Sequence, residues 1–143
     1  MFIVSACLAG KNCKYNGGNN DCEWVKKFIA SRECLLVCPE AELLGSPRPP
    51  SEIKEGRAFD KTGRDITEIL KDGAAGTWEK ALAKAGGKEK IEGAVLKANS
   101  PSCGCGKIYD GTFTGTLVDG DGFFAALLKE KGVNVTTERE VLL

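Results

Sequence analysis

The 143-residue sequence contains no histidine. This absence excludes Ser-His-Asp and Cys-His catalysis, zinc sites with histidine ligands, and the histidine-containing deaminase signature. Any acid–base chemistry in the protein must therefore use carboxylates, hydroxyls, lysine or thiols.

The sequence also lacks net charge, because 20 basic residues balance 20 acidic ones. No global field would recruit nucleic acid or an anionic membrane, so we expect neither as a partner. No stretch approaches the ~18 apolar residues of a membrane span. The residues before Cys7 lack the charged and apolar regions of a signal peptide. We therefore expect a cytoplasmic protein that forms a single domain over residues 1–143.

Cysteine, by contrast, is abundant, and the number of cysteines is odd. In a reducing cytosol these side chains would be thiols, which favours metal binding or catalysis over a disulfide framework. The seven cysteines are Cys7, Cys13, Cys22, Cys34, Cys38, Cys103 and Cys105.

Short apolar runs alternate with helical patterns along the chain. The runs are typical of strands buried on both faces of a parallel sheet. They cover residues 2–6, 34–37, 94–96 and 133–135. Asn20 or Asp21 could cap a first helix, and helical periodicity begins again at Ile66 and at Phe123. This order predicts an α/β fold, a single three-layer Rossmann-like domain with a mainly parallel sheet of about four strands.

Two connecting segments carry turn signals. Residues 39–56 hold four of the five prolines, and we expect a long functional loop without regular structure there. Asp110-Gly111, between Tyr109 and Phe113, predicts the turn of a hairpin.

Three of the cysteines fall where predicted strands end. Cys7 follows the first strand, Cys38 follows the second, and residues 100–105 with Cys103 follow the third. In open α/β sheets the ligand crevice lies outside the carboxyl ends of the strands, so these thiols should meet there. Such soft ligands suit zinc or an iron–sulfur cluster. A zinc site would need a fourth ligand, which Cys105 could supply, although the spacings fit no zinc ribbon.

Several motifs resemble those of one family. The segments "SACLAGKNCKYNGG", "VCPEAELLGSPRPPSEI" and "LKANSPSCGCGKIYDGTFTGTLVDGDG", with a final glycine–strand–glutamate, are similar to the DUF523 family, which includes the thiouracil desulfidases. The resemblance covers nearly the whole chain. It implies a [4Fe-4S] cluster held by three cysteines, which align with Cys7, Cys38 and Cys103, and an open iron that binds the substrate's sulfur.

The same resemblance implies an activity. The enzyme would remove sulfur hydrolytically, without net redox change, from a thiolated nucleobase such as 2-thiouracil or from a similar small thioamide. Cluster-dependent catalysis also implies dependence on iron–sulfur assembly machinery. The sequence is also compatible with two alternative functions. One is a non-catalytic zinc protein using Cys7, Cys38, Cys103 and Cys105. The other is a thiol sulfurtransferase or redox protein with Cys103 as a persulfide carrier.

Candidate catalytic groups lie beside the candidate ligands. Glu40 is two residues past Cys38, and without histidine a carboxylate is the natural base for an attacking water. The alternative for Glu40 is a helix N-terminal charge or a salt bridge. Ser100 and Ser102 could bind substrate or relay a proton, or simply cap a turn. The resemblance favours Ser100.

For the remaining candidate residues, structural roles are alternatives to functional ones. Arg48 could grip a pyrimidine carbonyl or an anion, or form a surface salt bridge. Cys22 and Cys34 fall on apolar patterns and are expected to be buried thiols. Cys13 lies in the turn, where its thiol could support the site next to the ligands, although a structural role is expected.

Overall fold

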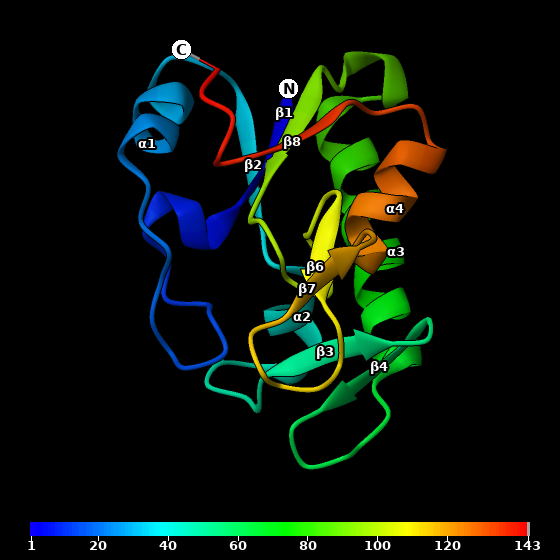
Figure 1. Ribbon diagram of the computed structural model, residues 1–143. Helices are drawn as coiled ribbons and strands as arrows, with labels where there is room; N and C mark the ends of the chain where they lie inside the picture. Colours follow the sequence, from blue (N-terminus) through cyan, green and yellow to red (C-terminus); the bar gives the residue numbers. More distant parts are fainter. Residues whose placement is uncertain (143) are drawn as a thin grey trace.

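The computed structural model describes residues 1–142, and at its centre lies a four-stranded sheet (Figure 1). All neighbouring strands are parallel, and their order is β2-β1-β5-β8. The strands are β1 (Phe2–Ser5), β2 (Cys34–Val37), β5 (Gly93–Leu96) and β8 (Val135–Thr137). The expected parallel sheet of about four strands is thus confirmed, with boundaries shifted by one or two residues.

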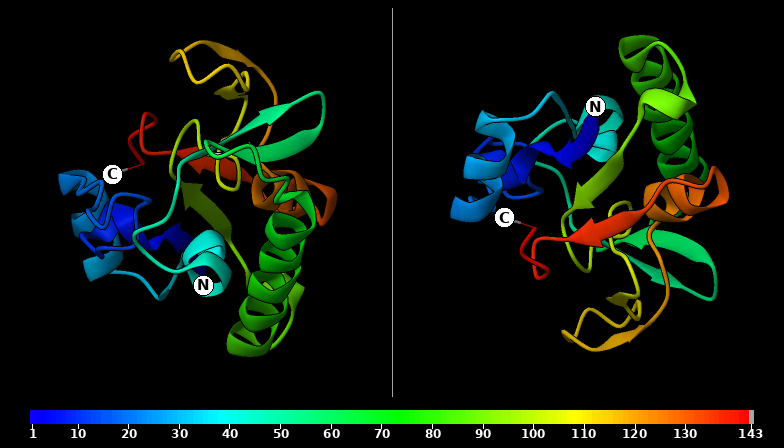
Figure 2. Two further views of the ribbon diagram at one scale, coloured as in Figure 1. Left: turned by 90° about the horizontal axis from the view of Figure 1, so that it is seen from below. Right: turned by 90° about the horizontal axis from the view of Figure 1, so that it is seen from above.

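Helices cover both faces of this sheet (Figure 2). One face carries α1 (Glu23–Ala30), and the other carries α3 (Thr67–Ala85) and α4 (Phe123–Glu130). The three-layer α/β architecture predicted from the sequence is therefore confirmed. No helix in residues 1–142 is both long enough and apolar enough to cross a membrane.

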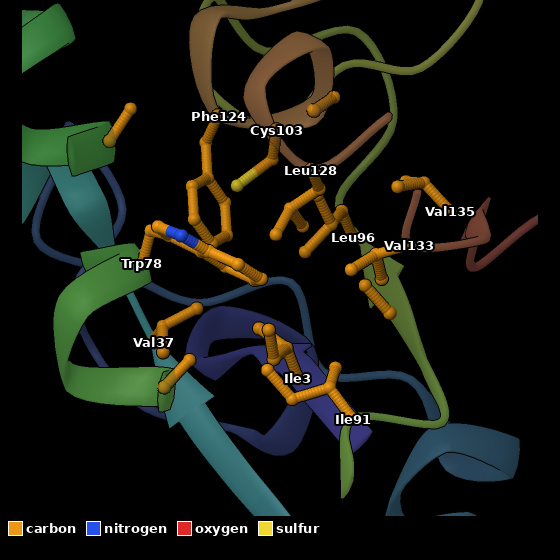
Figure 3. Packing of buried hydrophobic residues seen from close by; sticks show 14 of the residues in the cluster. Ile3, Val37, Trp78, Ile91, Leu96, Cys103, Phe124, Leu128, Val133 and Val135 are labelled. Carbon is orange, nitrogen blue, oxygen red and sulfur yellow. The ribbon is translucent and has the colours of Figure 1, made fainter. Parts of the chain in front are cut away.

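Adjacent residues of the central strand β1 serve the two cores. Side chains alternate across a strand, so Ile3 packs into the cluster beneath α3 and α4 while Val4 packs beneath α1. Figure 3 shows the larger cluster, in which Trp78 of α3 and Phe124 of α4 meet the strand residues. Cys103 lies in the same cluster beside Phe124, so one candidate ligand is anchored directly in the core.

Two antiparallel ribbons extend the fold beyond the central sheet. The first pairs β3 (Ser51–Lys54) with β4 (Arg57–Asp60), and the second pairs β6 (Lys107–Tyr109) with β7 (Leu117–Asp119). A third apolar cluster, which includes Ile53, Leu70 and Ile108, joins the ribbons to α3. Short 3-10 turns lie at Ala6–Ala9 (η1) and Lys88–Lys90 (η2). The hairpin expected around Asp110-Gly111 exists, with a connection spanning residues 110–116.

The expectation of an unstructured loop over residues 39–56 is wrong. This segment holds helix α2 (Pro39–Leu44) and strand β3. Pro39 occupies the first turn of α2, where its missing N–H and fixed φ cost nothing, so proline here starts a helix and does not prevent one. Only residues 45–50 between the two elements are irregular.

The expected cap of α1 is also wrong. The helix begins after Cys22, and neither Asn20 nor Asp21 supplies a side-chain cap. Asn20 instead directs its side-chain amide to the Cys7 sulfur, at 3.4 Å.

Candidate active site

A cavity of about 520 Å³ opens at the carboxyl edge of the central sheet. Cavities of this size suit small molecules. The candidate residues Cys7, Cys38, Cys103, Glu40 and Ser100 all line it. The structure therefore brings the three candidate ligands and both candidate catalytic residues to one cavity.

The three cysteines reach this cavity from three adjacent strands. Cys7 lies in η1, directly after β1, and Cys38 immediately follows β2. Cys103 lies in the loop after β5, where its backbone N–H donates to Ser100 Oγ at 2.7 Å. Since β2, β1 and β5 are neighbours in the sheet, their ends deliver the thiols to one place.

Burial and neighbouring thiols both raise the pKa values of Cys7 and Cys103. Burial raises the pKa of Cys7, and the hydrogen bond from Asn20 opposes this while the nearby Cys38 adds to it. Burial also raises the pKa of Cys103, with further contributions from Cys7 and Cys38. Three thiolates in such a place need a positive charge beside them, which a bound metal centre provides. The donor set thus fits a thiolate-ligated metal cluster.

Cys13 is a fourth thiol on the same cavity. Burial and the neighbouring Cys38 raise the pKa of Cys13 to about 12. The Cys38 thiol donates to the Cys13 carbonyl oxygen at 3.6 Å. The turn residue Cys13 therefore also lines the cavity, beside Cys38.

Glu40 and Arg48 form a buried ion pair at the cavity. Their side chains are 12% and 7% exposed, and Glu40 Oε2 lies 3.3 Å from Arg48 Nη2. Arg48 also donates to the carbonyl oxygens of Cys13 at 2.8 Å and Gly45 at 2.9 Å. Burial raises the pKa of the Glu40 carboxyl, and Arg48 opposes that rise. The suggested surface salt bridge of Arg48 is thus a buried one.

Two serines near Glu40 differ in their bonding. The Ser100 oxygen accepts the Cys103 N–H, so the turn-capping contact suggested by the sequence is present. The Ser102 hydroxyl is buried beside Glu40 and lowers the pKa of its carboxyl, yet makes no hydrogen bond of ordinary geometry within the described residues.

Sequence reasoning missed a second ion pair. Lys97 lines the cavity and lies 3.0 Å from Glu138 Oε2, while Glu138 Oε1 accepts the Ala98 N–H at 2.7 Å. Lys97 directly follows β5 and Glu138 directly follows β8. Their positions after strand ends were the signal that could have identified them.

Residues 2–140 match the family described as 2-thiouracil desulfurase. The chain belongs to this family. It is therefore an enzyme, and the family resemblance expected from the motifs is confirmed.

Two relatives agree with this membership. The chain is 41% identical to the uncharacterized protein YbbK of Bacillus subtilis (strain 168), over 99% of this chain and 97% of that protein. It is also similar to a solved structure, the [4Fe-4S]-dependent thiouracil desulfidase TudS (DUF523Vcz). The TM-score is 0.83 at 36% identity, covering 96% of this chain and 90% of the other.

Three further cysteines, Cys22, Cys34 and Cys105, do not line the cavity. The Cys105 thiol donates to the Val135 carbonyl oxygen at 3.7 Å and packs against the main core. Cys22 and Cys34 pack against the cluster beneath α1. Cys105 therefore does not join Cys7, Cys38 and Cys103, as the zinc reading required. Within residues 1–142, no three Cys, Asp or Glu side chains are arranged to hold a single metal ion.

Proposed function

We propose that this protein is an iron–sulfur-dependent desulfidase that hydrolyses the C=S group of a thiolated nucleobase such as 2-thiouracil, or of a similar small thioamide. The observation that carries the proposal is the delivery of three thiols from three adjacent strand ends to the cavity that also holds Glu40. Family membership and the likeness to a [4Fe-4S]-dependent thiouracil desulfidase support it.

Cys7, Cys38 and Cys103 are the residues that would hold a [4Fe-4S] cluster. Their convergence on one cavity suits a centre that binds all three as thiolates. When bound, such a cluster supplies a Lewis-acidic iron with an open position for a soft sulfur atom.

Glu40 is the general base in this proposal. Its carboxylate takes a proton from water, the water oxygen bonds to the thiocarbonyl carbon, and the C–S bond breaks. Glu40 gives that proton to the departing sulfur, and the second water proton passes to the sulfur as the added hydroxyl becomes the carbonyl oxygen. C=S and H₂O thus become C=O and H₂S with no electron transferred. Arg48 binds Glu40 Oε2 and the backbone of the Cys13 turn, which fixes the carboxylate in the cavity wall.

Ser100 is the second catalytic group that we propose. Its oxygen accepts the Cys103 N–H at 2.7 Å, which fixes the position of the hydroxyl next to a ligand cysteine. The hydroxyl hydrogen is left to donate to a substrate heteroatom. Ser100 thereby orients the ring or amide that carries the C=S group.

The proposed chemistry places the enzyme in the cytoplasm. Thiols stay reduced there, and iron–sulfur assembly machinery would supply the cluster. The other partner is the small sulfur-containing substrate, and we expect neither nucleic acid nor a membrane.

The test is the variant Glu40→Gln, which keeps the size of the side chain but cannot take a proton near neutral pH. A general base contributes about 10²–10⁴-fold to rate, so sulfide release from 2-thiouracil should slow by that order. Iron content and an absorbance titration with 2-thiouracil are measured on the same anaerobic sample. Normal iron, retained binding and slow release support the proposal. Unchanged turnover would remove Glu40 from the mechanism, and lost iron would make it a structural support for Cys38.

A further inference from the structure

Besides sulfur and charge, the cavity presents aromatic side chains. Three of its lining residues are aromatic: Tyr15, Tyr109 and Phe113. Tyr109 and Phe113 come from the hairpin of β6 and β7, which is separate from the strand ends that bring the thiols. The proposed reaction acts on the C=S group alone, so it does not explain why these aromatic side chains line the cavity.

The backbone at Phe113 is strained. Its φ is +58°, a left-handed conformation that is a genuine outlier for a bulky residue. Such strain persists only where surrounding structure holds it, and it gathers at functional sites. The side chain of Phe113 is half-buried and contributes to the cavity wall.

Glu52 of β3 holds the loop in this conformation. Its Oε1 accepts the N–H of Gly111 at 3.0 Å and the N–H of Phe113 at 3.0 Å. Gly111 also packs closely on β3, because a Cβ there would lie 2.5 Å from the Cβ of Lys54. One carboxylate oxygen thus pins the loop at two points before any ligand arrives.

Hydroxyl groups brace the rest of the same loop. Asp110 Oδ1 accepts the N–H of Thr112 at 2.9 Å and its hydroxyl at 2.6 Å. The hydroxyls of Thr112, Thr114 and Thr116 bond in series, at 2.6 and 2.9 Å. These bonds reduce the conformational freedom of the seven-residue connection, and such preorganisation favours binding.

We infer that Phe113 is a specificity-determining residue that stacks on a flat heteroaromatic ring, and that Glu52 positions it. Stacking between bases and aromatic side chains is a strong and general mode of recognition for such rings. The inference rests on the proposed function, whose substrate class it narrows from thioamides in general to ring thiocarbonyls. Phe113 then acts on binding, while the thiols and Glu40 act on the C=S bond.

Uracil is the probe for this inference, because it has the ring of 2-thiouracil without the sulfur. Binding is measured by calorimetry on anaerobically purified protein, with iron content matched between variants. Phe113→Leu keeps an apolar side chain without a ring, and should bind uracil about 10-fold more weakly, equal to about 1.4 kcal/mol. Phe113→Tyr keeps a ring and should bind like the wild type.

Glu52 gives a second, independent pair of variants. Glu52→Ala removes the acceptor of both N–H groups and should weaken uracil binding as Phe113→Leu does. Glu52→Gln keeps an amide oxygen that accepts both bonds, so it should retain wild-type affinity. Equal uracil affinity in Phe113→Leu and wild type, or no uracil binding by the wild type, would overturn the inference.

Kinetics separate this inference from the proposed function. Phe113→Leu should raise KM for 2-thiouracil about 10-fold with little change in kcat, and should leave kcat/KM for the acyclic thioacetamide unchanged. If the wild type released sulfide from neither 2-thiouracil nor thioacetamide, the proposed function would be refuted, whatever the uracil result. Normal sulfide release with an unchanged KM for 2-thiouracil in Phe113→Leu would refute the stacking role alone.

Discussion

Cys7 and Cys103 at the cavity differ from Cys34 in their neighbours more than in the direction of their pKa shifts. Burial raises the pKa of Cys34, just as it raises those of Cys7 and Cys103. For Cys34, however, every neighbouring charge comes from the N-terminus, arginine or glutamate. For Cys7 and Cys103, other thiols stand among the causes. A raised thiol pKa alone therefore does not mark a site, whereas several thiols that line one cavity do.

The two groups also differ in where the chain places them. Cys7 and Cys38 follow strand ends at the edge of the sheet, where side chains face open volume. Cys22 immediately precedes α1 and Cys34 begins β2, and both pack among apolar side chains. The position relative to a strand's carboxyl end distinguishes the two uses of the same residue type.

The largest expected difference between the two groups is in iron content. Cys38→Ala should abolish iron incorporation, and Cys7→Ala and Cys103→Ala should do the same, because two thiolates hold a cluster poorly. Cys22→Ala and Cys34→Ala should keep full iron and lose only some stability through a small cavity. Iron is measured after anaerobic reconstitution.

Two results would contradict this assignment of the iron ligands. Full iron loading in Cys38→Ala would show that the cavity thiols are not the ligands. Loss of iron in Cys105→Ala would indicate a fourth thiol ligand from outside the cavity. Iron content is also measured in Cys13→Ala, because the Cys13 thiol lines the cavity without following a strand.

A smaller effect is expected at two glycines of α3, one beneath the site and one facing solvent. A Cβ at Gly73 would lie 2.4 Å from the carbonyl oxygen of Pro39, so Gly73→Ala must displace α2. We expect a loss of about 1–3 kcal/mol in the free energy of unfolding and lower sulfide release, since α2 carries Glu40.

Gly76→Ala is the matched control on the same helix. Nothing lies within 4 Å of a Cβ at Gly76, so the change should stabilise the protein by about 0.5–1 kcal/mol without affecting activity. Urea denaturation under identical anaerobic conditions compares the two variants. Equal stability of Gly73→Ala and Gly76→Ala would show that the close packing of α2 on α3 is unimportant.

Much of this architecture could be predicted from the sequence. The apolar runs at β1, β2, β5 and β8 are clear because a strand buried on both faces needs no polar residues. The helix α2 could not be recognised from proline content, since Pro39 supports a helix at its first turn and opposes one only farther in. The strand β3 of the first antiparallel ribbon could not be recognised either, because the prolines within residues 39–56 favoured a loop.

The candidate site divides in the same way. Cys7, Cys38 and Cys103 could be brought together from topology alone, because the ends of parallel strands share an edge. The burial of Arg48 against Glu40 could not, since it depends on how the irregular residues 45–50 fold back over α2. The pinning of Phe113 by Glu52 joins positions 61 residues apart, and no local pattern signals such a contact.

The most direct test of the account is the metal content of the wild-type protein after purification without oxygen. Iron and acid-labile sulfide are quantified together with zinc on one sample, and the sample is then mixed with 2-thiouracil. We predict that the wild-type protein contains iron and acid-labile sulfide in equal amounts and little zinc. It should release hydrosulfide from 2-thiouracil, with uracil as the product. Zinc in place of iron, or sulfide release by protein that holds neither metal, would contradict it.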